Sequence, residues 1–368
     1  MGGRILALII KELLALFRDR TSRMTIIVPP LIQLLVFGYA ATFDLERIPM
    51  AVLDEDQGAV SRELVSRFTS STGFEQRGTL RSDAEIAPLI DSTKVLLVLH
   101  IGPQCTRNLG QGESCPVQVL IDGRNSNTAM LALNYVRTIV TDYNRELAEQ
   151  AGVSMPSRLE VRSWFNPNLE SRWFIVPGII GLLAMIVTLV VTALSVARER
   201  EDGTFDQLLV TPLRPWEILI GKAVPGLLVG VLESSLIVAV AVYWFRVPLV
   251  GELWVLYLGL FLYILSIIGV GLAISSFSAT LQQALLGSFL FIVPAIILSG
   301  FATPIANMPP FMQSVTWLNP MRYFLSMVRR IFLEGAGIHS FWNDLWPMAL
   351  IALVTLALST WLFRRRLY

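Results

Sequence analysis

The charged residues that separate two long apolar runs are the part of this sequence best suited to contact a partner. The stretch runs from Arg198 to Lys222 and mixes both signs of charge with a few apolar side chains. Residues 203–210 can form a short amphipathic helix, with Phe205, Leu208 and Leu209 as apolar anchors. The acidic rim around these anchors, which would pair with basic residues of a partner, consists of Glu199, Glu201, Asp202 and Asp206. Anchors within a polar rim are what a compact docking site needs, and the alternative is a well-capped turn without a partner.

No motif predicts catalysis by the chain itself. It lacks the GxxxxGK[ST] phosphate loop, the HExxH zinc motif and the GxSxG nucleophile elbow. The only histidines are His100 and His339, and no Cys/His cluster suggests a metal. We therefore expect no cofactor and no metal on this chain, and ATP hydrolysis, if any, in a separate subunit.

Glu233 is an acidic residue inside a long apolar run. An ionised carboxylate within a bilayer costs roughly 2.5–3.5 kcal/mol on insertion scales, so this side chain should face protein or water, or be protonated. Gly226 and Gly230 form a GxxxG pair on the same helix face, which we expect to pack against another helix. Glu233 is open to three interpretations: substrate binding, proton transfer or packing. Gln33 is a weaker candidate for a translocation pathway, since a lone glutamine more often hydrogen-bonds a neighbouring helix.

The composition is that of a membrane protein. Apolar residues make up 54% of the 368 residues and charged residues 15%, and the mean hydropathy is +0.61. A helix needs about 20 apolar residues to cross the hydrocarbon core. We predict a polytopic α-helical membrane protein with six transmembrane helices, near residues 24–43, 173–197, 218–245, 253–277, 281–301 and 345–363. The net charge of +1 gives no reason to expect nucleic acid as a partner.

The positions of lysine and arginine predict the orientation of these helices. With the N-terminus inside, few basic residues fall in the short outer segments, namely Arg246, Arg322, Arg329 and Arg330. We therefore place both termini in the cytoplasm. The first span, 24–43, follows a basic lead at 1–23 that is long for a signal peptide, so an uncleaved anchor is expected. Residues 3–18 of that lead predict an amphipathic helix, either in the membrane interface or as a cap on the first span.

Residues 44–172 predict an inserted extracytoplasmic α/β domain. Strands are expected at 48–53, 94–100 and 117–121, with a less certain last strand at 158–165, and helices at 61–68, 84–90 and 128–150. The run DGRNSN, with Asp122, Arg124, Asn125 and Asn127, follows a strand and opens a helix, so it predicts either an anion or partner site or a capped turn. If the domain faces an oxidising compartment, Cys105 and Cys115 can close a short loop as a disulfide; the alternative is two free thiols, and their spacing does not distinguish the two.

The segment between the last two spans is too apolar for an ordinary loop. Prolines at 304, 309, 310 and 320 exclude one continuous helix over residues 302–324. A pair of short re-entrant or interfacial helices satisfies this pattern, provided that protein or a water-filled cavity covers the broken backbone.

The chain resembles the permease subunits of type-2 ABC exporters, in particular a bacterial subfamily with a large extracytoplasmic domain after the first span. The resemblance covers essentially the whole chain. It is carried by REREDGTFDQLLVTPLRP at 198–215, by SGFATP, NMPP and LNPMRYF at 299–304, 307–310 and 318–324, and by DGRNSN at 122–127. One departure is Ala302, where many relatives have a larger apolar residue.

The resemblance implies two permeases, identical or paralogous, and two cytoplasmic ATPase subunits that use ATP and Mg²⁺. It implies the bacterial inner membrane, with 44–172 in the periplasm, 173–368 as a five-helix domain, amphiphilic or hydrophobic cargo, and in some assemblies a periplasmic adaptor. The coupling loop, 198–222, would contact the ATPase through Arg198, Glu199, Arg200, Glu201, Gly203, Thr204, Phe205, Asp206, Leu208, Leu209, Thr211 and Pro212. The outer gate would contain Gly300, Phe301, Pro304, Met308, Pro309, Asn319, Pro320, Arg322 and Tyr323. The rival hypotheses are a membrane receptor or scaffold whose outer domain binds a ligand, and a membrane enzyme.

Overall fold

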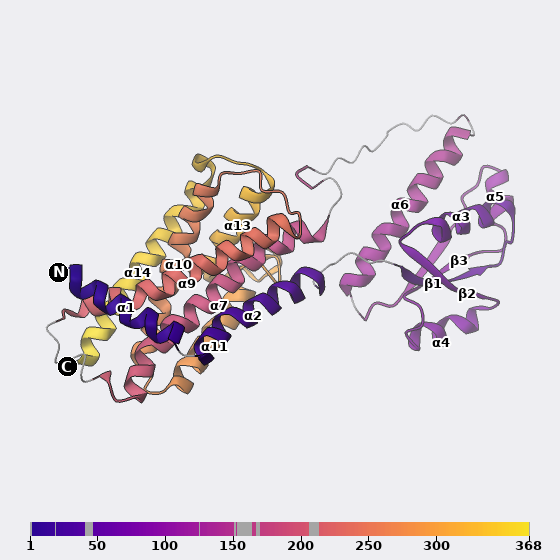
Figure 1. The fold of residues 1–368 in the computed structure, drawn as a ribbon. Helices are drawn as coiled ribbons and strands as arrows, with labels where there is room; N and C mark the ends of the chain where they lie inside the picture. Colours follow the sequence, from indigo (N-terminus) through magenta and orange to yellow (C-terminus); the bar gives the residue numbers. More distant parts are fainter. Residues whose placement is uncertain are drawn as a thin grey trace. The chain divides into compact units, whose positions relative to one another are not determined.

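The chain forms two compact units, each described here by itself (Figure 1). Unit 1 comprises Met1–Thr42 and Ser163–Tyr368, and unit 2 comprises Phe43–Arg162. The computed structural model describes residues 2–18, 20–40, 47–124, 126–150, 152, 164–166, 170–205 and 213–367.

Unit 1 is built from helices. They are α1 (Gly2–Arg18), α2 (Arg20–Ala40), α7 (Ser171–Glu201), α9 (Pro215–Tyr243), α10 (Leu253–Phe277), α11 (Leu281–Ile297), α12 (Pro310–Val315), α13 (Pro320–Leu333) and α14 (Trp342–Leu367). Among the described residues, α7, α9, α10 and the stretch Ile338–Arg365 are long and apolar enough to cross a membrane. The chain is thus a mostly helical protein with candidate membrane spans.

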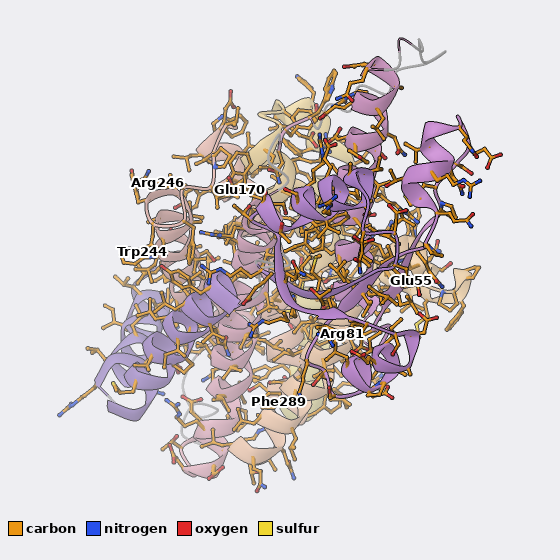
Figure 2. The ribbon with its side chains drawn as sticks, turned by 90° about the vertical axis from the view of Figure 1, so that its right-hand side faces the viewer. Glu55, Arg81, Glu170, Trp244, Arg246 and Phe289 are labelled. Atoms are coloured by element: carbon orange, nitrogen blue, oxygen red, sulfur yellow. A yellow bond between two sulfur atoms is a disulfide. The ribbon has the colours of Figure 1, made fainter. Side chains whose placement is uncertain are left out.

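Two of the six predicted spans are not among these four candidate spans. Helix α2 covers the first predicted span and contains Pro29 and Pro30, and α11 has 17 residues, fewer than a perpendicular span needs. The count of six transmembrane helices therefore stays a prediction. Apolar side chains of α11 point outward, among them Phe289, which is labelled in Figure 2. The label Arg246 marks the turn after α9, where this residue has a φ of 53°.

Glycines let three helices of unit 1 approach closely. A Cβ at Gly226 or Gly230 of α9 would lie 2.5 Å from Thr192 Cγ2 or 2.4 Å from Thr188 Oγ1, both on α7. Gly271 of α10 faces Thr192 in the same way. The glycine face of α9 therefore packs on α7 of the same chain, as small residues do at membrane helix interfaces.

An aromatic pair joins α7, α10 and α13. The rings of Tyr263 and Phe324 stack with their centroids 4.6 Å apart, and both residues are fully buried. The Tyr263 hydroxyl donates to the carbonyl of Gly181 at 2.9 Å, and a Cβ at Gly181 would meet the Phe324 ring at 2.9 Å. The glycine of α7, the tyrosine of α10 and the phenylalanine of α13 fit together closely, and this packing holds the three helices in one arrangement.

Unit 2 contains a four-stranded sheet of order β2-β1-β3-β4. Its strands are β1 (Ile48–Asp54), β2 (Phe74–Leu80), β3 (Leu97–Ile101) and β4 (Val117–Ile121), with β4 antiparallel to β3 and the other pairs parallel. Its helices are α3 (Ala59–Ser70), the 3₁₀ turn η1 (Asp83–Glu85), α4 (Ile86–Asp91), α5 (Cys105–Gly110) and α6 (Ser126–Gln150). The unit is therefore a mixed α/β fold.

Alternation along β1 divides the core of unit 2 between the two faces of the sheet. Met50 and Val52 pack with side chains of α3, α5 and α6 on one face, while Ala51 and Leu53 pack with α4 on the other. The strands expected at 48–53, 94–100 and 117–121 are present, with β3 shorter than expected, and so is the long helix after them. Strand β2 and helix α5 were not predicted, and the expected strand at 158–165 lies largely outside the described residues.

The structure joins Cys105 and Cys115 by a disulfide, the first of the two alternatives that the sequence left open. The bond joins the start of α5 to the segment before β4, across a sequence separation of 10 residues. It fits a compartment that is oxidising.

We predict that replacing both cysteines by serine lowers the free energy of unfolding of unit 2 by on the order of 2–3 kcal/mol, the loop-closure value for a short loop. Protease susceptibility of the full chain in urea measures this change. Wild-type protein with the disulfide reduced is the control and should behave like the double variant; equal resistance of oxidised wild type and double variant would contradict the prediction.

Candidate functional site

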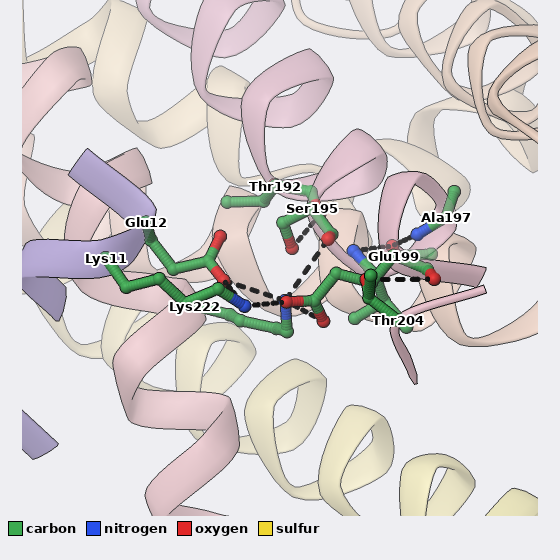
Figure 3. Close-up of polar contacts among 10 residues, drawn as sticks. Lys11, Glu12, Thr192, Ser195, Ala197, Glu199, Thr204 and Lys222 are labelled. Atoms are coloured by element: carbon green, nitrogen blue, oxygen red, sulfur yellow. Dashed lines mark hydrogen bonds and ion pairs between the residues drawn. The ribbon is translucent and has the colours of Figure 1, made fainter. Parts of the chain in front are cut away.

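Lys222 is the buried centre of a cluster of charged side chains at one end of unit 1 (Figure 3). Its side chain is 0% exposed, and its Nζ lies 2.7 Å from Glu199 Oε2 and 3.1 Å from Glu12 Oε1. It also donates a hydrogen bond to the carbonyl of Ser195 at 3.1 Å. Lys11 Nζ completes the cluster, 2.6 Å from Glu199 Oε1. We call Lys11, Glu12, Glu199 and Lys222 the charged joint.

The charged joint fixes α1 to the start of α9. Leu8 of α1 fills the space over Gly221, where a Cβ would lie 2.3 Å from Leu8 Cδ2. One turn later, Glu12 reaches the neighbouring Lys222. Burial raises the pKa of the Glu12 carboxyl above its ordinary value, and the Lys222 ammonium offsets part of that rise. The amphipathic helix is thus held by a fitted apolar contact and an ion pair together.

The joint also fixes the end of α7, which reaches Glu201, so residues 198–201 continue the helix. Arg200 donates to the carbonyls of Ser276 and Ser278 at the end of α10, at 2.9 and 3.1 Å. Glu201 accepts from the N–H of Leu281 at 2.7 Å, at the start of α11. Glu199 and Glu201, predicted to pair with a partner, are therefore both engaged inside the chain.

Phe205 also turns inward. Its ring packs edge-on against Phe363 of α14 at 6.1 Å and lies under the Arg200 guanidinium at 4.9 Å. Gly203, just before it, has a φ of 69°, the left-handed conformation that commonly ends a helix. Phe205 was predicted to be an exposed anchor for a partner. In the structure its ring instead closes the core between the ends of α7 and α14.

The described chain resumes at the start of α9. The N–H of Arg214 donates to the Glu217 carboxylate at 2.7 Å, and Pro215 occupies the first turn. Glu217 is buried, so this cap is fixed in the core. Of the predicted coupling residues, Asp206, Leu208, Leu209, Thr211 and Pro212 lie outside the described residues, whereas both ends of that stretch are anchored.

Beside the charged joint is a cleft of about 640 Å³. Its walls come from α1, α7, α9 and the start of α11, and are mostly apolar, for example Leu16, Leu194 and Leu285. Glu12, Arg198, Asp202, Thr204 and Lys222 also line it.

The predicted gate residues gather after α11, at the other end of α7. Gly300 has a φ of 85°, and Phe301 lies against Gly178 near the start of α7, where a Cβ would meet its ring at 2.7 Å. Asn319 caps α13 and donates to the carbonyl of Ala295 at 2.7 Å. The remaining members lie in the turns around α12 and in the first turn of α13, including Pro304, Met308, Pro309, Pro320, Arg322 and Tyr323.

Arg322 and Tyr323 brace the turn before α13. The Arg322 guanidinium bonds Thr316 and lies over the Trp317 ring at 5.5 Å, and the Tyr323 hydroxyl donates to the carbonyl of Trp317 at 3.0 Å.

The other predicted site residues do not join the charged joint. Glu233 is buried in α9, and neither of its carboxylate oxygens has a hydrogen-bond partner among the described residues. Gln33 is half-buried on α2. In unit 2 the Arg124 guanidinium pairs with Asp122 at 2.7 Å and lowers the pKa of that carboxyl, which matches the capped-turn interpretation. Asn125 and the Asn127 side chain lie outside the described part.

Sequence reasoning missed the joint itself, since Lys222 was considered only as the end of a stretch. A signal was available: Lys222, Gly226 and Gly230 follow a four-residue spacing on the face of α9 that packs inward. A lysine on such a face requires a buried carboxylate.

Comparison with known proteins places these features in a family. The family described as "ABC-2 family transporter protein" matches residues 20–361 of this chain. The chain is 42% identical over 366 residues to the "Probable multidrug ABC transporter permease YbhR" of Escherichia coli K12, covering 100% of both chains. It is 32% identical to the "Probable multidrug ABC transporter permease YbhS" of the same organism, over 90% of this chain and 89% of that one. The "Inner membrane transport permease YhhJ" is 28% identical over 95% and 94% of the two chains.

We predict that Lys222→Met destabilises the folded chain by about 3–5 kcal/mol, because it leaves a buried carboxylate without its cation. The double variant with Glu12→Gln should regain most of this loss, since the Lys11–Glu199 pair remains balanced. Unfolding in mixed micelles with increasing SDS measures both.

The matched control is Lys11→Met, whose side chain is 51% exposed and which should change stability by about 1 kcal/mol or less. Equal effects of Lys11→Met and Lys222→Met, or no recovery in the double variant, would show that the joint is not a balanced buried cluster.

Proposed function

This chain belongs to the ABC-2 family of transporter permeases, and we propose that it moves hydrophobic or amphiphilic compounds outward when a separate ATPase pulls on residues 198–222. The main support for this proposal is the charged joint, because it fixes both ends of this segment to transmembrane helices. The permease itself is no enzyme, and the ATPase is a separate subunit in ABC transporters.

The anchored ends explain how the segment passes on a movement. Phe205 is packed on α14 and the Arg214 N–H is capped by Glu217, so residues 206–212 are bracketed by two fixed points. A partner that grips the middle through Leu208 and Leu209 would therefore move the ends of α7 and α9. Helix α1 would follow, because separating it from α9 would leave Lys222 and Glu12 buried without their counter-charge.

Helix α7 connects this end of unit 1 with the predicted gate. Its 31 residues correspond to a length of about 46 Å at 1.5 Å per residue. Gly178 and Gly181 near its start hold Phe301 and Phe324, and Glu199 near its end belongs to the charged joint. We propose that ATP-driven closure of two ATPase subunits tilts α7 and α9 and thereby shifts the segment 302–324, which acts as the outer gate.

The cargo and the assembly are inferred from the relatives. Relatives whose names contain "multidrug" support a hydrophobic or amphiphilic cargo, with Glu233 and Gln33 as candidate residues of the pathway. A second permease copy or paralogue would complete that pathway, because unit 1 exposes apolar faces such as that of α11. A periplasmic adaptor and direct contact with lipid are further expected partners.

For the location we propose the bacterial inner membrane, with both termini in the cytoplasm and residues 44–172 in the periplasm. Two contacts support termini on one side: Glu12 near the N-terminus reaches Lys222, and Phe363 near the C-terminus reaches Phe205. The Cys105–Cys115 disulfide supports an oxidising environment for unit 2.

Leu208→Arg is predicted to weaken binding of the cognate ATPase about thirtyfold, the loss expected for roughly 2 kcal/mol at an interface hot spot. ATP-dependent export should fall with it. The matched control is Gln207→Arg, which adds the same charge beside the apolar face and should reduce binding less than threefold or so. Co-purification and export are measured at equal membrane levels; wild-type values for Leu208→Arg would contradict the docking assignment.

The topology has its own test. Alkaline phosphatase fused after Gly152 should be active, because that enzyme folds only in the oxidising periplasm, and a fluorescent protein fused to the C-terminus should fluoresce in the cytoplasm. An inactive phosphatase fusion together with a C-terminus that does not fluoresce, at normal expression of both fusions, would reject the proposed orientation without affecting the family assignment.

A further inference from the structure

An apolar groove of about 370 Å³ opens on the surface of unit 2. It lies among α3, α5, β4 and α6, and its volume falls within the range of small-molecule sites. Most of its lining residues are apolar, including Val60, Leu64, Leu109, Val117, Val119, Leu133, Val136, Val140 and Leu147.

The groove exists because the helices do not fully cover the last strand of the sheet. Helices α3 and α6 bury Met50, Val52 and Leu99 of the central strands completely. On the edge strand β4, Val117 and Val119 point to the same face but are only partly buried. The Cys105–Cys115 disulfide lines the groove and ties α5 to β4, which holds one wall in place.

An exposed apolar groove is more informative in unit 2 than in the helices of unit 1. Lipid or another subunit covers apolar surfaces of a membrane helix. Unit 2 exposes charged side chains such as Glu75 and Arg77 on a strand of its sheet, which is typical of a surface in water. An apolar groove that faces water marks a binding site more often than a surface without function.

Within the described part of unit 2, one charged side chain lines the groove, and it is a cation. Arg137 is exposed on α6, and no hydrogen bond or ion pair to it is found among the described residues. Three other arginines of the unit, Arg67, Arg124 and Arg145, each pair with a carboxylate. Thr141 and Asn144 follow Arg137 at helical spacing on the same side and add polar groups to the lining.

We propose that this groove binds an anionic amphiphile, with the apolar body between α6 and β4 and the anionic group at Arg137. A guanidinium at the rim of an apolar site supplies a charge-assisted hydrogen bond to a carboxylate, sulfonate or phosphate. The lining residues that the structure describes include no carboxylate that would compete for Arg137. The site belongs to unit 2, so its occupancy does not depend on ATP hydrolysis or on the docking of an ATPase.

The test uses the full chain in nanodiscs of zwitterionic lipid, so that no detergent competes for the groove. The probes are dansyl-undecanoic acid and its methyl ester, whose fluorescence rises on transfer to an apolar site. We expect saturable binding of the acid. Arg137→Glu should weaken that binding at least about tenfold, as loss of a charge-assisted hydrogen bond predicts, and should change binding of the ester less than about twofold.

Two further variants separate the groove from other effects. Arg107→Glu places the same charge change on α5 at a residue outside the groove and should bind both probes like wild type. Val140→Trp fills the groove and should abolish binding of both, with the Cys105–Cys115 disulfide still intact by mass spectrometry as a check of folding. Absence of saturable binding by wild type, or equal loss with Arg107→Glu and Arg137→Glu, would overturn the proposal, and the first outcome would leave the groove to a protein partner.

Discussion

A lysine ammonium with no access to water has to be neutralised by carboxylates, and this requirement organises one end of the permease. Lys222 of α9 is neutralised by Glu199 of α7 and Glu12 of α1, from three segments far apart in the sequence. Separating any one of them would leave charge in a medium of low dielectric constant. The arrangement therefore favours movement of the three segments together over movement of one past the others.

This constraint supports the mechanical role that we propose for the segment between α7 and α9. The residues on either side of it are fixed by Phe205 in the core and by the cap at Glu217. Helix α7 then extends to the turn that follows α11, where glycines accept Phe301 and Phe324. A force applied between α7 and α9 is transmitted along packed helices, since a close-packed interior has little room to absorb it.

The sequence predicted element types better than partners. Continuous apolar runs identified β1 and β3 and the long helices, because burial on both faces leaves a strong pattern. Strand β2 was missed, since Glu75, Gln76 and Arg77 carry no such pattern at a sheet edge. Glu199 and Phe205 were expected to face a partner and turned inward instead. A residue type indicates that a charge needs a counter-charge or that a ring needs apolar contacts, but not which distant group of the chain provides them. The balance of the charged joint depends on α1, whose position only the tertiary structure provides.

If the buried charges hold α1 and the start of α9 together, the two move as one body while the transporter works. In Leu8→Cys/Gly221→Cys, oxidation would join the two helices after they part by a few tenths of an ångström, since a Cβ at Gly221 lies 3.2 Å from that of Leu8 and the two Cβ atoms of a disulfide lie about 3.5–4.5 Å apart. ATP-driven export of a hydrophobic dye by the complex with its ATPase is then compared before and after cross-linking, with wild type treated identically. We expect the cross-linked permease to retain its export rate. Loss of export on cross-linking, restored by reduction, would show that α1 has to separate from α9 and would contradict the account.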